Sequence, residues 1–88
     1  MTIAFPPDEL PLLSHGGNLI FTAVEDSGKI IPCGISFEAL REHFGAKAIN
    51  SHDMYRAFNG NRAAIHKKAS EALALNGGNS ILLMRDHF

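Results

Sequence analysis

Two adjacent polar residues, Asn61 and Arg62, fall inside a long apolar pattern of helical spacing. On a helical wheel Asn61 lies in the middle of the apolar face, between Phe58 and Ile65. A buried amide without a hydrogen-bond partner costs about 1–3 kcal/mol. We therefore expect Asn61 to bond a loop or strand-end backbone group and so pin the helix to a sheet, or alternatively to line a ligand pocket. Arg62 is expected to extend toward solvent or to pair with a carboxylate such as Asp86 or the chain end.

The opposite side of the same pattern carries positive charge and hydrogen-bond donors. The candidate partner-binding residues on this basic outer face are Arg56, Asn59, His66 and Lys67. Basic donors around a shallow floor suit phosphate groups or an acidic protein surface, whereas the simpler interpretation is a solvated helix face. Aromatic residues are not interleaved on it, which disfavours single-stranded nucleic acid because bases stack on such rings.

Other chemistry has little support in the residue pattern. The five histidines include no i, i+4 pair, and His52 and His66 would lie about 21 Å apart on one helix. Cys33 falls on the apolar face of a strand and is expected to be a small core residue. The glycine pairs lack the spacing of phosphate-binding or dinucleotide-binding loops. The sequence therefore predicts no metal site, no cofactor and no enzyme.

Length and composition favour one small domain, residues 1–88. The chain is 45% hydrophobic, enough for a packed core, and its single cysteine excludes an internal disulfide. The longest apolar run, Ile81–Met84, is too short to span a membrane, and no secretory signal is visible, so we expect a cytoplasmic protein.

The net charge of −1 argues against a dedicated nucleic-acid binder. The charges are nevertheless unevenly distributed: residues 1–40 hold five acidic and one basic side chain, and residues 41–68 hold six basic and two acidic ones. Charge asymmetry of this kind bears on association with partners and leaves the fold open.

The first half of the chain has strand and turn patterns. Thr2–Phe5 is expected to form an edge strand, and residues 8–17 an irregular excursion. Alternating residues predict strands over Asn18–Glu25 and Lys29–Ile35, joined as a hairpin. Because Pro32 lacks a backbone donor, it should face an open edge or a bulge.

The second half is mainly helical. Ser36 is expected to cap a short helix that ends at Gly45, and Ser51 to cap a long helix from His52 to about Leu75. Gly60 weakens that long helix, which leaves its continuity there open. Ser80–Arg85 is expected to form the last strand.

These elements predict an α+β fold in the order β-β-β-α-α-β. We expect an antiparallel sheet of three to four strands, with one short and one long helix packed on one face.

Three groups of residues, in this order and spacing, carry a family resemblance: Ile35-Ser36-Phe37-Glu38-Ala39-Leu40 with His43-Phe44-Gly45; Ala57-Phe58 with Asn61-Arg62 and Ile65; and an apolar strand closed by Phe88. Together they resemble the bacterial domain-of-unknown-function family 1488, over nearly the whole chain. The resemblance implies a small stand-alone α+β protein of the bacterial cytoplasm and implies no activity.

The sequence alone leaves the function unknown. We interpret the protein as a small non-catalytic binding or accessory module whose contact surface is the basic outer face, with an unidentified protein or anionic partner and no membrane. One alternative is a nucleic-acid-associated regulator. The other is a self-associating protein that forms a homodimer by pairing the Pro32 strand or the N-terminal strand with a second copy.

Overall fold

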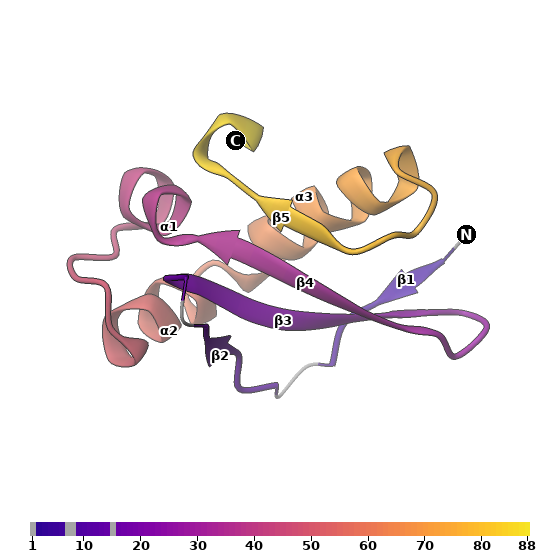
Figure 1. Ribbon diagram of the computed structural model, residues 1–88, viewed down its shortest axis with the longest axis horizontal. Coiled ribbons are helices and arrows are strands. Elements are labelled where there is room, and N and C mark those ends of the chain that lie inside the picture. The colour runs from indigo at the N-terminus through magenta and orange to yellow at the C-terminus, as the bar shows by residue number, and fades with distance from the viewer. Residues whose placement is uncertain (1, 7–8, 15) are drawn as a thin grey trace.

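The computed structural model describes residues 2–6, 9–14 and 16–88. Its elements in chain order are β1 (Ile3–Ala4), β2 (Leu12–Leu13), β3 (Asn18–Glu25), β4 (Ile30–Ser36), α1 (Phe37–Phe44), α2 (Ser51–Asn59), α3 (Arg62–Leu75), β5 (Ile81–Leu83) and a final 3-10 turn, η1 (Arg85–His87). The stretch over residues 8–17, expected to be irregular, contains a two-residue strand, β2. Asp8 and His15 of this stretch lie outside the described residues. The α+β class is confirmed (Figure 1).

The sheet is built on the predicted hairpin of β3 and β4. These strands pair antiparallel from Val24 opposite Ile30 to Asn18 opposite Ser36. Short strands β1 and β2 both pair antiparallel with β3, near its two ends. Between them the Glu9 carboxylate accepts a 2.8 Å hydrogen bond from the Thr22 N–H. The Glu9 side chain thus provides a hydrogen-bond partner for a backbone group in the middle of this edge of β3, where no strand pairs with it.

The expectation of a purely antiparallel sheet is wrong at β5. This strand pairs parallel with β4, with Ile81 opposite Cys33 and Leu83 opposite Ile35. The reason is the helical connection: α1, α2 and α3 carry the chain back along the sheet, so β5 runs in the same direction as β4. Strand β4 therefore lies between β3 and β5 and is not an edge strand, contrary to what Pro32 suggested. The pairing with β5 begins at Cys33, one residue after Pro32. The N–H that Pro32 lacks is therefore not needed for a hydrogen bond to β5.

All the helices pack on one face of the sheet, as expected. The alternating inward residues of β3 and β4 include Leu19, Phe21, Cys33 and Ile35, which are buried. The helices and β5 complete the core with Ala39, Leu40, Met54, Ala57, Phe58, Ile65, Ala69, Leu73 and Leu83. In Figure 1 the strands lie in front of α3.

The short helix α1 follows its sequence signals closely. The Ser36 hydroxyl accepts a 3.1 Å hydrogen bond from the Ala39 N–H, and Gly45 ends the helix with φ at 80°. Both predicted caps are confirmed. The cap of α2 differs by one residue, because the Asn50 side chain rather than that of Ser51 accepts from the Asp53 N–H, at 2.8 Å.

The predicted long helix is two helices, α2 and α3, which makes three helices in place of two. In a continuous helix the Asn61 N–H would bond the Ala57 carbonyl. Here it bonds the Phe58 carbonyl instead, and Asn61 leaves helical geometry with φ at −134°. The Asn61 side-chain amide donates to the vacated Ala57 carbonyl at 2.9 Å. Asn61 therefore stabilises the break after Gly60, and the expectation that it pins a helix to the sheet is wrong.

Candidate functional site

Arg62 ties the N-terminal segment to the junction of α2 and α3. One guanidinium nitrogen donates to the Glu9 carbonyl, and Nε donates to Asn59 Oδ1 at 2.9 Å. The guanidinium carbon also lies 5.2 Å from the centre of the Phe58 ring. The expected pairing with Asp86 is wrong, because the Asp86 carboxylate lies 3.6 Å from Arg85 Nε instead. Arg62 thus holds together segments that are 53 residues apart in sequence.

His66 lies against the aromatic part of the core. Its ring stacks on Phe5, with centroids 4.1 Å apart and planes within 3° of parallel. The rings of Phe21 and Phe58 lie within 6 Å of it. Burial, and secondarily the positive charge of Arg62, lower the pKa of the His66 imidazole below its usual value.

The four candidate partner-binding residues do not form one face. Arg56 is exposed on α2, Asn59 is hydrogen-bonded to Arg62, and His66 packs on Phe5. Lys67 is exposed on α3 and lines a hollow with residues of α1. The cause is the break at Gly60 and Asn61, because a single helical wheel drawn through residues 52–75 does not apply on both sides of it.

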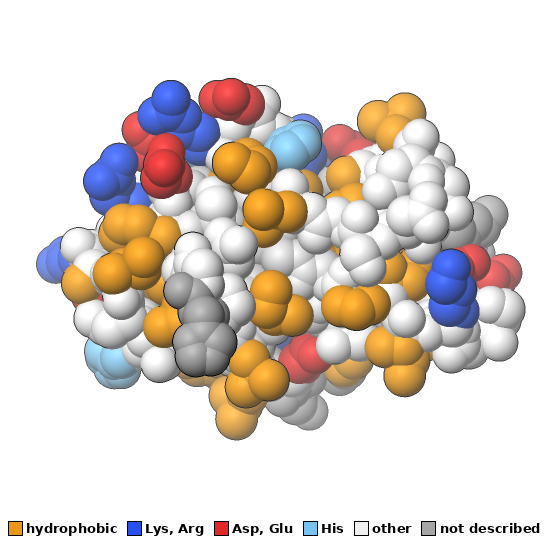
Figure 2. Space-filling model, in the orientation of Figure 1, with side chains coloured by type: hydrophobic (Ala, Val, Ile, Leu, Met, Phe, Trp, Pro, Cys, Tyr) orange, Lys and Arg blue, Asp and Glu red, His pale blue; other side chains and the backbone are white. Residues whose placement is uncertain are grey.

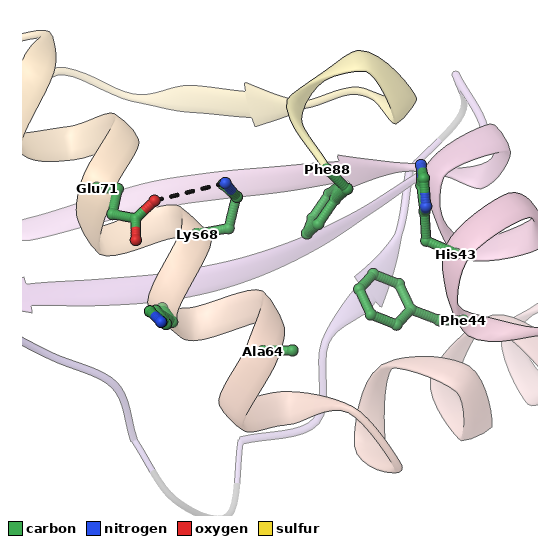
Figure 3. A pocket seen from close by; sticks show the side chains of 7 residues that line it. His43, Phe44, Ala64, Lys68, Glu71 and Phe88 are labelled. Atoms are coloured by element: carbon green, nitrogen blue, oxygen red, sulfur yellow. Dashed lines mark ion pairs between the residues drawn. The ribbon is translucent and has the colours of Figure 1, made fainter.

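That hollow, which we call the α1–α3 hollow, has a volume of about 420 Å³. It is lined by His43, Phe44, Ala64, Lys67, Lys68, Glu71 and Phe88. Figure 3 shows the rings of Phe44 and Phe88 facing the side of α3. These two rings pack edge to face, 5.1 Å apart at an interplanar angle of 89°. They give the hollow an aromatic wall.

Polar contacts of η1 with α1 hold this wall in place. Arg85 Nη1 lies 3.7 Å from a Glu38 carboxylate oxygen and 3.6 Å from one of Glu42. The Arg85 carbonyl lies 3.0 Å from Nε2 of His43. These contacts keep η1 on α1 and so place Phe88 beside Phe44.

The rim contributed by α3 is basic. Lys68 Nζ pairs with a Glu71 carboxylate oxygen at 3.4 Å, drawn as a dashed line in Figure 3. Lys67 makes no ion pair with any carboxylate in the described part of the chain. A charged amine at this rim is available to an acidic group of a partner. The sequence identified Lys67, but His43, Phe44 and Phe88 were missed because only the tertiary fold brings them beside α3.

The family of the chain follows from its sequence over almost the whole fold. Residues 3–83 match the model of the family described as Protein of unknown function (DUF1488). The chain belongs to this family. No curated protein and no solved structure matches it. Membership of DUF1488 therefore confirms the resemblance and leaves the function unknown.

Two further findings describe this DUF1488 protein. None of its helices, over the described residues, is long and apolar enough to cross a membrane. Within those same ranges, no three His, Cys, Asp or Glu side chains come together in a way that could hold a metal ion.

The pH dependence of stability should reveal the environment of His66. Because its folded-state pKa lies below the unfolded value of about 6.5, the unfolded chain binds more protons as the pH falls through that region. The contribution of His66 to stability is therefore complete above pH 6.5 or so, and is lost as the pH falls toward the folded pKa. Urea unfolding across this pH range measures it.

A His66→Gln variant is the matched comparison for this measurement. It leaves every other titrating group in place, so the difference between the two pH profiles isolates His66. Parallel profiles would show that the imidazole titrates as it does in the unfolded chain, and would contradict the packing against Phe5.

Proposed function

We propose that this protein is a small, non-catalytic binding module of the bacterial cytoplasm that holds a segment of a partner protein in the α1–α3 hollow. The segment would combine an apolar side chain with acidic groups. The observation that carries the proposal is the pairing of the Phe44–Phe88 wall with the amine of Lys67 at the rim. An apolar side chain would fit against the rings, and a carboxylate would approach Lys67.

The residues of the hollow support binding rather than catalysis. The described lining contains no serine, threonine or cysteine, and two of its other candidate nucleophiles, Lys68 and Glu71, are paired with each other at 3.4 Å. Its histidine, His43, is hydrogen-bonded to the Arg85 carbonyl.

The aromatic wall also favours a protein segment over nucleic acid. A single-strand binder combines a basic groove with rings on which bases stack face to face. The faces of Phe44 and Phe88 are partly occupied by their edge-to-face packing.

An NMR titration tests this proposal. The probe is a synthetic peptide that alternates leucine and glutamate, and the comparison peptide has lysine in place of glutamate. We expect the acidic peptide to shift the backbone amides of Ala64, Lys67 and Phe88, and Lys67→Glu to weaken binding by about tenfold, as for the loss and reversal of one exposed charge contact. Lys47→Glu changes the same charge outside the hollow and should leave binding nearly unchanged.

Two outcomes would overturn the proposal. One is equal binding of the acidic and basic peptides, and the other is an absence of shifts around the hollow. A single-stranded DNA oligonucleotide is titrated in parallel. Binding of the DNA in preference to the peptide, lost as salt is raised, would instead support the nucleic-acid-associated regulator.

A further inference from the structure

The face of the sheet turned away from the helices is apolar. The side chains that alternate with the core residues of β3, β4 and β5 point to this side. We call it the open sheet face, and its main members are Ile20, Thr22, Val24, Ile30, Pro32 and Leu82. At the hairpin end, Ile30 is 67% exposed. An antiparallel sheet that meets water on one face normally carries polar residues there.

None of the described strand residues that point to the open sheet face is charged. Figure 2 views the molecule from this side: hydrophobic and uncharged surface fills the middle, and the charged side chains gather mainly around the periphery. Removing this face from water costs little desolvation energy, because its described strand residues carry no charge.

The open sheet face is low at its centre, where a hollow of about 280 Å³ is lined by residues that include Ile20, Gly34 and Leu82. A Cβ atom on Gly34 would lie 3.0 Å from Leu82 Cδ1 and 3.4 Å from Ile20 Cδ1. The two side chains therefore lean over Gly34 from the neighbouring strands and fill the space that a larger residue would occupy. The result is an apolar layer across β3, β4 and β5 that has a hollow, and no raised ridge, in the middle.

We propose that a second copy of this chain covers the open sheet face, so that two sheets pack face to face with the helices outside. The argument for a second copy is that the described strand residues of this face carry no charge. A partner with charged groups at the contact would bury them opposite apolar side chains without counter-charges, which is costly. The described strand residues of a second copy's open sheet face bring no such charges. Packing of one such face against another is isologous, so the assembly closes as a dimer.

The area of the open sheet face limits the affinity of this dimer. The five described strands hold 22 residues, and about 3.4 Å along a strand and about 4.8 Å between strands for each residue give a plan area of about 360 Å². Specific stable interfaces bury about 800 Å² on each partner. The contact is therefore smaller than a standard interface, and we expect a reversible dimer that forms with rising concentration.

Sedimentation equilibrium at protein concentrations from about 1 µM to 1 mM tests the proposal, a range that spans weak interfaces. The test variant Ile30→Lys places a charge on the open sheet face. The control Leu75→Lys places the same charge at an equally apolar position, 90% exposed at the end of α3 on the helical side. We expect the wild type and Leu75→Lys to dimerise alike, and Ile30→Lys to raise the dissociation constant by at least about tenfold.

A second variant, Thr22→Lys, repeats the test at the centre of β3, and circular dichroism checks that each variant is folded. A wild type that stays monomeric up to the highest concentration would overturn the proposal and leave the face to another partner. Dimerisation that is unchanged in both folded lysine variants would overturn it in favour of strand pairing at a sheet edge. Neither outcome depends on peptide binding in the α1–α3 hollow.

Discussion

Replacing Phe58 with alanine is expected to lower the free energy of unfolding by about 3–5 kcal/mol. The ring is fully buried, with its centroid 5.3 Å from that of Phe21 and 5.8 Å from that of His66. Its removal opens a cavity between α2 and the sheet and also takes away the surface over which the Arg62 guanidinium lies. Small domains are stable by only about 5–15 kcal/mol, so a large share of the stability would be lost.

Urea unfolding followed by circular dichroism measures this loss. Leu75→Ala is the control, since Leu75 is a large apolar residue that is almost fully exposed, and its truncation should change stability by less than about 0.5 kcal/mol. Phe58→Leu keeps much of the volume and should fall between the two. Similar stabilities for Phe58→Ala and Leu75→Ala would show that Phe58 is not in the core.

The thiol of Cys33 should react at least about a hundredfold more slowly in the folded protein than in the unfolded chain. Burial, with the negative charge of Glu9 as the second cause, raises the pKa of this thiol from 9.0 to about 11. The thiolate is the reactive form, and a rise of two pKa units lowers its fraction at neutral pH by about a hundredfold. Cys33 is also only 1% exposed, which further limits the approach of a reagent.

Labelling with a chromogenic disulfide reagent, with and without denaturant, measures the two rates. The same assay on Phe58→Ala tests whether the reactivity of Cys33 depends on the stability of the core. A less stable core opens more often, so Cys33 should be labelled faster in this variant. Rapid labelling of the folded wild type would mean that β4 is accessible from the helical side, contrary to the packing described above.

Local sequence signals were sufficient for the hairpin and for α1. Their structure is set by contacts between residues close in sequence, and such contacts can be predicted from the sequence. The residues that make them are those of the turn between β3 and β4, Ser36 and Gly45. The apolar alternation in β3 and β4 likewise placed Cys33 in the core. Family membership was also predicted from residues spread along the chain and is confirmed.

The candidate site required information that local patterns do not contain. The helical wheel assumed that Gly60 and Asn61 continue one helix, whereas the Asn61 amide bonds the Ala57 carbonyl and ends it. That change removed His66 from the expected basic outer face and left Lys67 beside α1. The direction of β5 and the position of Phe88 depend on contacts between distant segments, which spacing alone does not reveal.

The parallel pairing of β5 with β4 has a consequence for the order of folding. The β3–β4 hairpin joins neighbouring segments, so it closes only a short loop. Strand β5 can pair with β4 only after the residues of all three helices have been synthesised, because these helices lie between Cys33 and its partner Ile81 in the sequence. Contacts between residues so distant in sequence form slowly, since a long loop must close first. We therefore expect docking of β5 to be the late step in folding, and a chain still emerging from the ribosome to have β4 exposed along one edge until then.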